Sequence, residues 1–294
     1  MRIVSLVPHA TELLFALGLG EQVVGVTHEC DYPEGASARR HVTRDLLPRG
    51  LAQHEIDAAV RERTERGEAI YALDEDVLAD LEPTLIVTQA LCPVCAVSYD
   101  DVTAIAGRLD PQPQVISLDP KTLGETMGDI RTVAQATKSR DAALELVARQ
   151  RSRIDAVKIA VRKERRPDVV AIEWFDPVFI AGHWTPQLIE LAGGTDVLGF
   201  AGERSEQMSW DAVRAAKPEV VLCIPCGYDA AGALDQARLF EDELRSTGAR
   251  RIVALDASAY FSRPGPRLVD GLETLAHLLH PGAVASAPGA ILEL

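Results

Sequence analysis

Short apolar runs alternate with helix-patterned segments twice along this chain of 294 residues. In the first series the apolar runs have the length of single strands and end at turn-forming or polar residues; they are residues 3–7, 23–26, 85–88 and 115–118. Apolar residues at helical spacing mark the segments that follow them, which are residues 11–19, 57–66, 74–81 and 102–109. Strands that alternate with helices favour a mostly parallel, doubly wound sheet. The sequence therefore predicts an N-terminal α/β lobe over residues 1–120.

The same alternation resumes after residue 166. Its strand-like runs are residues 169–172, 220–222 and 252–255, and its helix-like segments are residues 186–191, 210–215, 240–246 and 268–279. These elements predict a C-terminal α/β lobe over residues 167–281. The residues beyond it, 282–294, are small and turn-forming, so we expect them to form a flexible tail.

Between Pro120 and Arg166 the chain has no strand pattern at all. A polar break at Lys138-Ser139-Arg140 suggests a joint between two helices. From Asp141 to Glu164 apolar residues recur three and four apart until Pro167 ends the pattern. A helix of about 24 residues spans roughly 36 Å, the width of a domain. We therefore expect a helical segment over residues 121–166 whose long helix links the two lobes.

Charge and hydropathy exclude two classes of partner. The chain has 44 acidic and 30 basic residues, a net charge of −14, so the phosphates of a nucleic acid would be repelled. No run approaches the ~18 apolar residues that a membrane span needs, so no membrane insertion is expected. The first residues lack the pattern of a signal peptide, and as written the chain is expected in the cytoplasm. The alternative is a periplasmic or other extracytoplasmic location, if the true start lies upstream.

Four of the five cysteines form two C-x-x-C pairs, and each pair follows an apolar run. The pairs are Cys92/Cys95 and Cys223/Cys226, while Cys30 stands alone in the segment His-Glu-Cys-Asp-Tyr-Pro. In a reducing cytosol such thiols indicate metal, ligand or redox chemistry more than structural disulfides. Two pairs could together bind zinc, iron or a cobalt-containing ligand, and either pair could act as a redox dithiol. A third interpretation, small polarizable side chains that line a pocket, stays open beside these.

Ligands of open parallel sheets bind at the carboxyl ends of the strands. The candidate ligand-binding residues are therefore those that follow the predicted strands: Pro8, His28, Cys30, Tyr32, Leu91, Cys92, Cys95, Trp174, Phe175, Phe179, His183, Trp184, Cys223, Cys226, Gly227, Tyr228, Tyr260, Phe261 and Arg263. Four aromatic residues between 174 and 184 could form one wall for a large flat ligand, or could be core residues. His183 follows Ala-Gly and could bind a metal or a ligand, or could be an ordinary loop histidine.

No catalytic pattern emerges from the sequence. It contains no Ser-His-Asp order, no phosphate loop and no helix with paired carboxylates, and Gly18-Leu-Gly20 lacks the third glycine of a dinucleotide-binding motif. We therefore predict no catalytic residues and expect a protein that binds a small molecule without converting it.

Three segments resemble the vitamin B12 and iron-siderophore substrate-binding proteins of ABC importers, the helical-backbone metal receptors. These segments are RIVSLVPHATE (2–12), VVGVTHECDYP (23–33) and LEPTLIV (81–87), and the similarity continues through residues 177–182 and 262–267. It covers essentially the whole chain and is closest to the cobalamin-binding branch. The resemblance implies an α/β fold of two Rossmann-like lobes with mostly parallel sheets, one long rigid helix between them, and a ligand cleft between the lobes.

The resemblance also implies the ligand and its surroundings. We expect a corrinoid such as cobalamin, or a related metal chelate, between Tyr32 and the Cys92 loop on one side and Phe175, Phe179, Gly227-Tyr228 and Ala259-Tyr260-Phe261 on the other. An ABC permease would be the partner of an exported protein. The alternative function is a cytosolic metal- or thiol-dependent enzyme that handles a corrinoid through the four paired cysteines.

Overall fold

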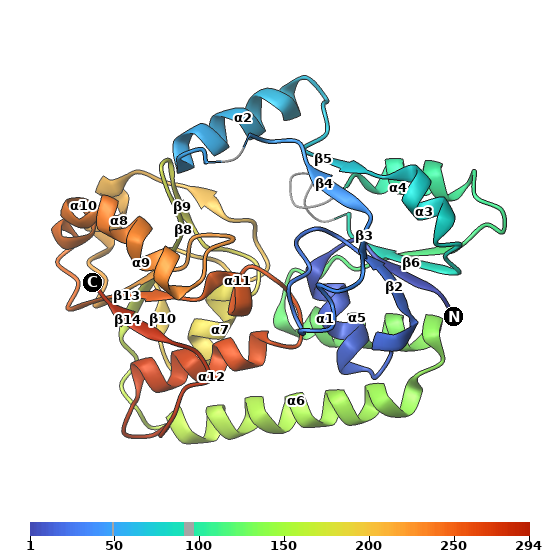
Figure 1. Cartoon of the computed structure of the whole chain (residues 1–294). Coiled ribbons are helices and arrows are strands. Elements are labelled where there is room, and N and C mark those ends of the chain that lie inside the picture. Colours follow the sequence, from blue (N-terminus) through green and yellow to red (C-terminus); the bar gives the residue numbers. More distant parts are fainter. Residues whose placement is uncertain (49, 91–96) are drawn as a thin grey trace. The chain divides into compact units, whose positions relative to one another are not determined.

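The computed structural model describes residues 1–48, 50–90 and 97–294 (Figure 1). It divides into two compact units. Unit 1 consists of Met1–Pro120 and Met127–Val147, and unit 2 consists of Lys121–Thr126 and Ala148–Leu294. This division has a boundary after Pro120, and it divides residues 121–166, which we expected as one helical segment, between the two units.

The core of unit 1 is a five-stranded, wholly parallel sheet of order β3-β2-β1-β6-β7. The strands are β1 (Ile3–Ser5), β2 (Val23–Val26), β3 (Arg40–His41), β6 (Leu85–Thr88) and β7 (Gln114–Ser117). Helices α1 (Pro8–Ala16), α3 (Glu75–Asp80) and α4 (Tyr99–Ala106) connect them. Apolar side chains of the sheet, such as Val4 and Ile86, pack against Leu78 and Val102 of the helices. The predicted parallel α/β lobe is confirmed.

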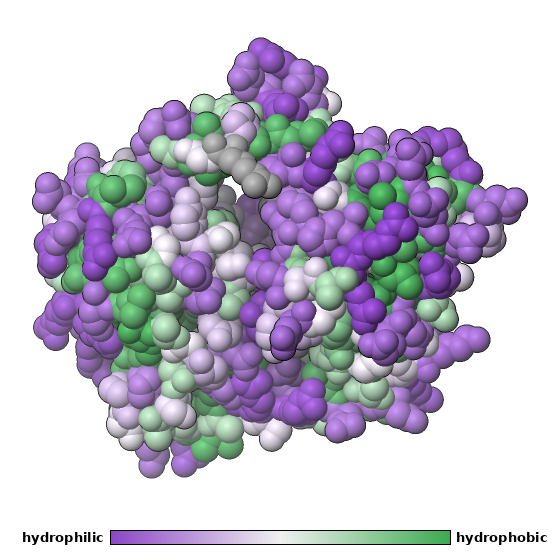
Figure 2. Space-filling view, viewed as in Figure 1, coloured by the Kyte–Doolittle hydropathy of each residue, from purple (hydrophilic) through white to green (hydrophobic). Residues whose placement is uncertain are grey.

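Three further elements of unit 1 lie outside this sheet. Strands β4 (Thr43–Asp45) and β5 (Tyr71–Leu73) pair antiparallel, and α2 (Gln53–Glu65) lies between them in the chain. Of the α2 residues only Gln53 is buried, and hydrophilic residues cover most of this part of the surface in Figure 2. Helix α2 therefore contributes little apolar packing to unit 1.

Unit 2 is built on a mixed sheet of order β11-β9-β8-β12-β13-β14, with β10 also beside β8. Its strands are β8 (Asp168–Phe175), β9 (Val178–Ile180), β10 (Thr195–Asp196), β11 (Glu206–Gln207), β12 (Val220–Cys223), β13 (Arg251–Leu255) and β14 (Ile291–Glu293). The central strands β8, β12 and β13 are parallel, as predicted, while β9, β11 and β14 are antiparallel to their neighbours. The apolar core gathers side chains such as Val170, Ile172 and Val221 from these strands.

The helices of unit 2 are α7 (Thr185–Leu191), α8 (Trp210–Ala216), α9 (Ala230–Leu239), α10 (Glu241–Ser246), α11 (Ala257–Tyr260) and α12 (Leu268–Leu279). Four of them, α7, α8, α10 and α12, match predicted segments, whereas α9 and α11 were not predicted. Side chains cap several of them; Asp229, for example, accepts a hydrogen bond from the Gly232 amide at 2.7 Å at the start of α9. Such caps fix where α8, α9 and α11 begin.

The predicted long helix is α6 (Arg140–Val161), whose 22 residues span about 33 Å. It follows α5 (Leu123–Thr137) after a break at Lys138, whose φ of 57° is left-handed, so the predicted joint is confirmed. Within unit 2, Arg153 of α6 donates to Glu273 of α12 at 2.8 and 2.6 Å and to Asp270 at 2.5 Å. These charged hydrogen bonds favour the ionised guanidinium and raise its pKa, although partial burial acts in the opposite direction. Among the described residues, no helix is both long and apolar enough to cross a membrane.

The C-terminal residues correct one prediction. We expected a flexible tail over 282–294, but Ile291–Glu293 forms β14, which pairs antiparallel with β13 at the edge of the sheet. Leu292 and Leu294 pack against the core of unit 2. The packing of two apolar side chains and the pairing with β13 order the end of the chain, although the residues before β14 are small.

This packing gives the first testable prediction. Leu292→Ala removes partly buried apolar surface from the core of unit 2, so we expect the free energy of unfolding to fall by about 2 kcal/mol. Leu144→Ala is the matched control, because the Leu144 side chain is 59% exposed and its removal should change stability by less than about 0.5 kcal/mol. Urea unfolding of both variants gives the measurement, and equal losses would show that β14 is not held by its side chains.

Candidate ligand-binding site

The site begins at the carboxyl ends of three parallel strands in unit 2. Ile172 of β8, Cys223 of β12 and Ala254 of β13 stand at the same level of the sheet. The loops that follow are hydrogen-bonded to one another: the Cys226 amide donates to the Glu173 carbonyl at 3.1 Å, and the Ser258 amide donates to the Tyr228 carbonyl at 3.0 Å. The predicted loops after β8, β12 and β13 therefore form one continuous surface, called here the strand-end surface of unit 2.

The aromatic residues predicted for this surface fall into two groups. Phe175, Trp184 and Phe261 are buried: Phe175 stacks on Phe240 at a ring distance of 5.5 Å, and the Trp184 Nε1 donates to the Phe261 carbonyl at 2.6 Å. These three pack within unit 2, and their contact with a ligand stays a prediction. Partly exposed side chains form the second group, which consists of Trp174, Phe179, Tyr228 and Tyr260.

Trp174 stands out in the second group. Its indole nitrogen is buried and has no hydrogen-bond partner among the described residues. A buried donor without a partner costs free energy that a ligand acceptor could recover. Arg263, also predicted for this surface, is partly buried, and Gly227 has a left-handed φ of 83° with open space where a Cβ would lie.

The second C-x-x-C pair is split by the fold. Cys223 ends β12 and is fully buried in the apolar core, where loss of hydration strongly raises the pKa of its thiol. Cys226, three residues later, is exposed. A thiol that stays protonated inside the core is a poor metal ligand and a poor redox partner, so binding of zinc or iron by this pair finds no support. Within the described part of the chain, no three His, Cys, Asp or Glu residues gather as a metal site. Leu91, Cys92 and Cys95 lie outside the described residues.

Glu173 was not among the predicted site residues. The sequence did offer a signal, because an acidic residue directly follows the apolar strand Val-Val-Ala-Ile. Burial raises the pKa of its carboxyl to about 7, and a hydrogen bond with Ser205 offsets part of that rise. Near neutral pH this carboxyl is therefore present in both protonation states, as an acceptor and as a donor.

The strand ends of unit 1 carry the other predicted residues. His28 follows β2; its amide and its Nδ1 both lie within hydrogen-bonding distance of the Thr43 hydroxyl, at 3.2 and 2.8 Å. The His28 ring contacts Tyr71, whose hydroxyl donates to Glu29 at 3.3 Å. Burial, together with the charges of Glu29 and Asp45, raises the pKa of Tyr71 above its usual value and keeps the phenol protonated.

Three more predicted residues of unit 1 differ in exposure. Cys30 is buried, with its sulfur 3.1 Å from the Thr11 hydroxyl and 3.2 Å from that of Thr27. Pro8 begins α1 and is partly buried, and Tyr32 is 46% exposed. Tyr32 is thus the most exposed of the three, and the Cys30 thiol joins two elements of unit 1.

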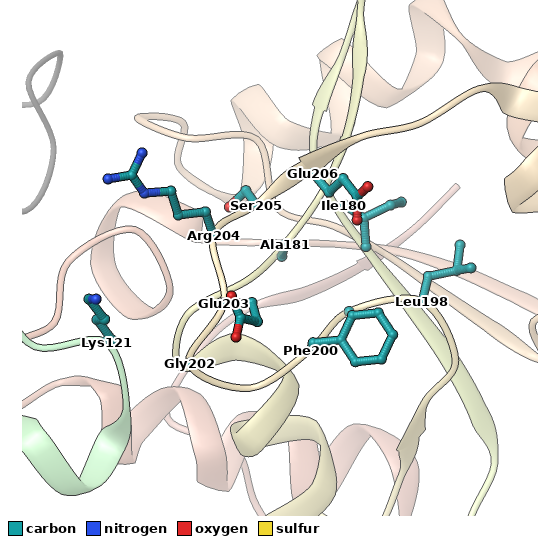
Figure 3. A pocket seen from close by; sticks show the side chains of 11 residues that line it. Lys121, Ile180, Ala181, Leu198, Phe200, Gly202, Glu203, Arg204, Ser205 and Glu206 are labelled. Carbon is teal, nitrogen blue, oxygen red and sulfur yellow. The ribbon is translucent and has the colours of Figure 1, made fainter.

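A pocket of about 420 Å³ lies beside the strand-end surface of unit 2 (Figure 3). We call it the 198–206 pocket; it is lined by Lys121, Ile180, Ala181, Leu198, Gly199, Phe200, Gly202, Glu203, Arg204, Ser205 and Glu206. The Asp196 carboxylate shapes its loop by accepting hydrogen bonds from the Leu198 and Gly199 amides at 3.1 and 2.7 Å. Ser205 belongs to both the pocket and the strand-end surface, because it also bonds to Glu173.

His183 lies against the backbone of this pocket. Its φ of 53° is left-handed, and the conformation is held by two hydrogen bonds: its amide donates to the Glu203 carbonyl at 2.6 Å, and its carbonyl accepts from the Gly202 amide at 2.8 Å. Burial lowers the pKa of the His183 imidazole, and the charges of Arg204 and Lys121 lower it further. His183 is therefore neutral at neutral pH, in a positive local field.

The second prediction tests this field. Arg204→Gln removes one of the two charges that disfavour the imidazolium, so we expect the pKa of His183 to rise while staying below its usual value, because burial persists. Titration of the histidine ring signals by NMR measures the change. Arg162→Gln removes an exposed charge elsewhere in unit 2 and serves as the control. An unchanged His183 titration in Arg204→Gln would show that the field has another origin.

Two α/β units, each with aromatic and polar residues at the strand ends of its sheet, form the framework of the candidate site. The chain belongs to the periplasmic binding protein family, whose sequence profile matches residues 3–252. A vitamin B12-binding protein of Vibrio cholerae is 22% identical over 285 residues, which are 95% of this chain and 88% of that protein.

Solved structures of the same class share the fold. The periplasmic heme-binding protein RhuT from Roseiflexus sp. RS-1 is 27% identical with a TM-score of 0.70, over 96% of this chain and 98% of that one. The vitamin B12 binding protein BtuF of Vibrio cholerae is 20% identical with a TM-score of 0.66, over 95% and 96% of the two chains. The family and the α/β fold class predicted from the sequence are confirmed.

The similarity to these relatives bears on the two functions expected from the sequence. They are binding proteins, which favours the binder over the thiol-dependent enzyme. They are described as periplasmic, which favours the extracytoplasmic alternative over a cytoplasmic location.

Proposed function

We propose that this chain is the substrate-binding component of an ABC importer and binds a corrinoid, or a related tetrapyrrole, outside the cytoplasm. The observation that carries the proposal is the strand-end surface of unit 2, where partly exposed Trp174, Phe179, Tyr228 and Tyr260 lie at the carboxyl edge of a parallel sheet. Aromatic side chains at such an edge suit a large flat ligand. Relatives that share this fold are named for vitamin B12 and for heme.

In this proposal strand-end residues of each unit contact the ligand. Tyr32, which is exposed, and His28 would contact it from unit 1. The unpartnered indole nitrogen of Trp174 would donate to an amide or carboxylate of the ligand, and Glu173 would donate or accept beside it. A permease that receives the ligand from the loaded protein completes the proposed pathway.

Titration of the purified full chain with hydroxocobalamin, and separately with haemin, tests the proposal through the visible spectrum of each ligand. We expect saturable binding of at least one of them. Trp174→Ala should weaken it about tenfold, since one aromatic contact and one hydrogen bond are lost. Tyr99→Ala, which removes a 36% exposed aromatic side chain from α4, should leave the affinity unchanged. Binding of neither macrocycle overturns the proposal.

A cysteine variant separates the binder from the enzyme alternative. It carries Cys92→Ser, Cys95→Ser and Cys226→Ser with Cys223→Ala, because a serine hydroxyl would be unsatisfied in the core that surrounds Cys223. Comparable ligand affinity in this variant supports a plain binder. Stoichiometric zinc or iron in the purified wild type that disappears in the variant would support the thiol-dependent alternative.

A further inference from the structure

The 198–206 pocket has a cationic end without counter-ions. Lys121 and Arg204 both line it, and neither side chain makes a hydrogen bond or an ion pair with a described residue. Most arginines in unit 2 behave differently; Arg153, Arg165 and Arg166, for example, are each paired with a carboxylate. Two unpaired cations in one pocket of a chain with a net charge of −14 are an exception that a ligand could explain.

His183 lies next to this end of the pocket, and the charges of Arg204 and Lys121 both act on its imidazole. The imidazole also contacts the Trp184 ring at a centroid distance of 5.5 Å. A positive field that reaches a neighbouring side chain also reaches a ligand in the pocket. The field therefore favours an anion at this end.

The opposite part of the lining presents the apolar side chains of Phe200 and Leu198. Phe200 is 66% exposed, and it lies with Leu198 on the side of the pocket away from Lys121 and Arg204 in Figure 3. Covering an exposed aromatic ring with an apolar group of a ligand removes apolar surface from water and so favours binding. Glu206 lies near Ile180, and Glu203 lies between the two ends, so a ligand with several negative charges would be repelled.

We propose that the 198–206 pocket is a binding site for an organic anion with one acidic group and an apolar body, such as an aromatic carboxylate or sulfonate. The acidic group binds Lys121 and Arg204, and the apolar body covers Phe200 and Leu198. The loop is built to hold this shape, because Asp196 fixes its first turn and Gly182 lets residues 203–205 approach closely. The site goes beyond the proposed function, since its lining includes none of the aromatic strand-end residues, although it shares Ser205 with the strand-end surface.

A matched pair of fluorescent probes tests the site on the full chain. The probes are 1-anilinonaphthalene-8-sulfonate and N-phenyl-1-naphthylamine, which share a ring system and differ by one sulfonate. We expect the sulfonate probe to bind more tightly, with an affinity that falls as salt is added. Lys121→Gln with Arg204→Gln should weaken it about tenfold and leave the neutral probe unchanged. Phe200→Ala should weaken both probes.

The control is Arg162→Gln with Lys163→Gln, which changes the net charge equally at two exposed positions of unit 2. The proposal is overturned if the sulfonate probe binds the pocket variant as tightly as wild type, or if the control weakens it equally. Far-UV circular dichroism checks that each variant is folded. Cobalamin and haemin titrations of the same variants report on the proposed function separately, so failure of one proposal is distinguishable from failure of the other.

Discussion

Glu173→Gln is expected to stabilise unit 2 at pH 8 and to remove most of its pH dependence between about pH 5 and 7. The folded unit raises the pKa of this carboxyl from 4.5 to about 7 by burial. The unfolded chain therefore releases the proton at a lower pH than the folded chain does, and stability falls as the pH rises through this interval. Each pKa unit corresponds to about 1.4 kcal/mol, so the full loss is about 3 kcal/mol. Glutamine stays neutral and avoids it.

Tryptophan fluorescence is a selective readout for this experiment, because all three tryptophans, Trp174, Trp184 and Trp210, lie in unit 2. Urea unfolding at pH 5 and pH 8 gives the two free energies of unfolding for each protein. Glu164→Gln, at an exposed position of unit 2, is the control and should keep the wild-type pH dependence. The same dependence in Glu173→Gln would show that another group titrates.

Gly182→Ala is expected to destabilise unit 2 by about 2 to 4 kcal/mol and to open the 198–206 pocket. A Cβ at this position would lie 2.6 Å from three backbone atoms, the Arg204 carbonyl carbon, the Glu203 oxygen and the Ser205 nitrogen. Backbone cannot rotate away as a side chain can, so residues 203–205 must move. The hydrogen bond from the Gly182 amide to the Ser205 hydroxyl, 3.3 Å long, would be lost with them.

Gly124→Ala is the matched control for this prediction. It lies in the first turn of α5 in unit 2, where a Cβ would meet its nearest neighbour, the Thr122 hydroxyl, at an ordinary 3.8 Å. There alanine should be neutral or slightly stabilising, because it has the higher helix propensity. Urea unfolding followed by tryptophan fluorescence compares the two variants. Equal stability of both would show that residues 203–205 tolerate the displacement.

The regular part of the fold could be predicted because periodicity decides it. Strands such as β6 and β12 are short runs in which every residue is buried. Helix α6 repeats its apolar residues over six turns. The strands that were not predicted are all two or three residues long: β3, β4, β5, β9, β10, β11 and β14. A run of that length has no period, and only its tertiary partner makes it a strand.

The candidate site could be predicted as a set of strand ends but not as a set of side-chain directions. Val170 and Ile172 of β8 point into the core, and strict alternation would place Trp174 there next. The β8–β9 register shifts between Ile172 and Trp174, so Phe175 enters the core instead and Trp174 remains partly exposed. The sequence also could not predict that Lys121 and Arg204 line the same pocket, because these residues are 83 positions apart and share no motif.

The chain passes from one unit to the other three times, after residues 120, 126 and 147. Neither unit is therefore a contiguous stretch of sequence, and no single cut separates them. A fragment that begins at Ala148 would lack Lys121–Thr126, and with it the lysine of the 198–206 pocket. During synthesis, unit 1 is complete only once Val147 has left the ribosome, by which time the first six residues of unit 2 are already made. Circular permutants that begin at Met127 offer a direct way to ask whether that order matters for folding.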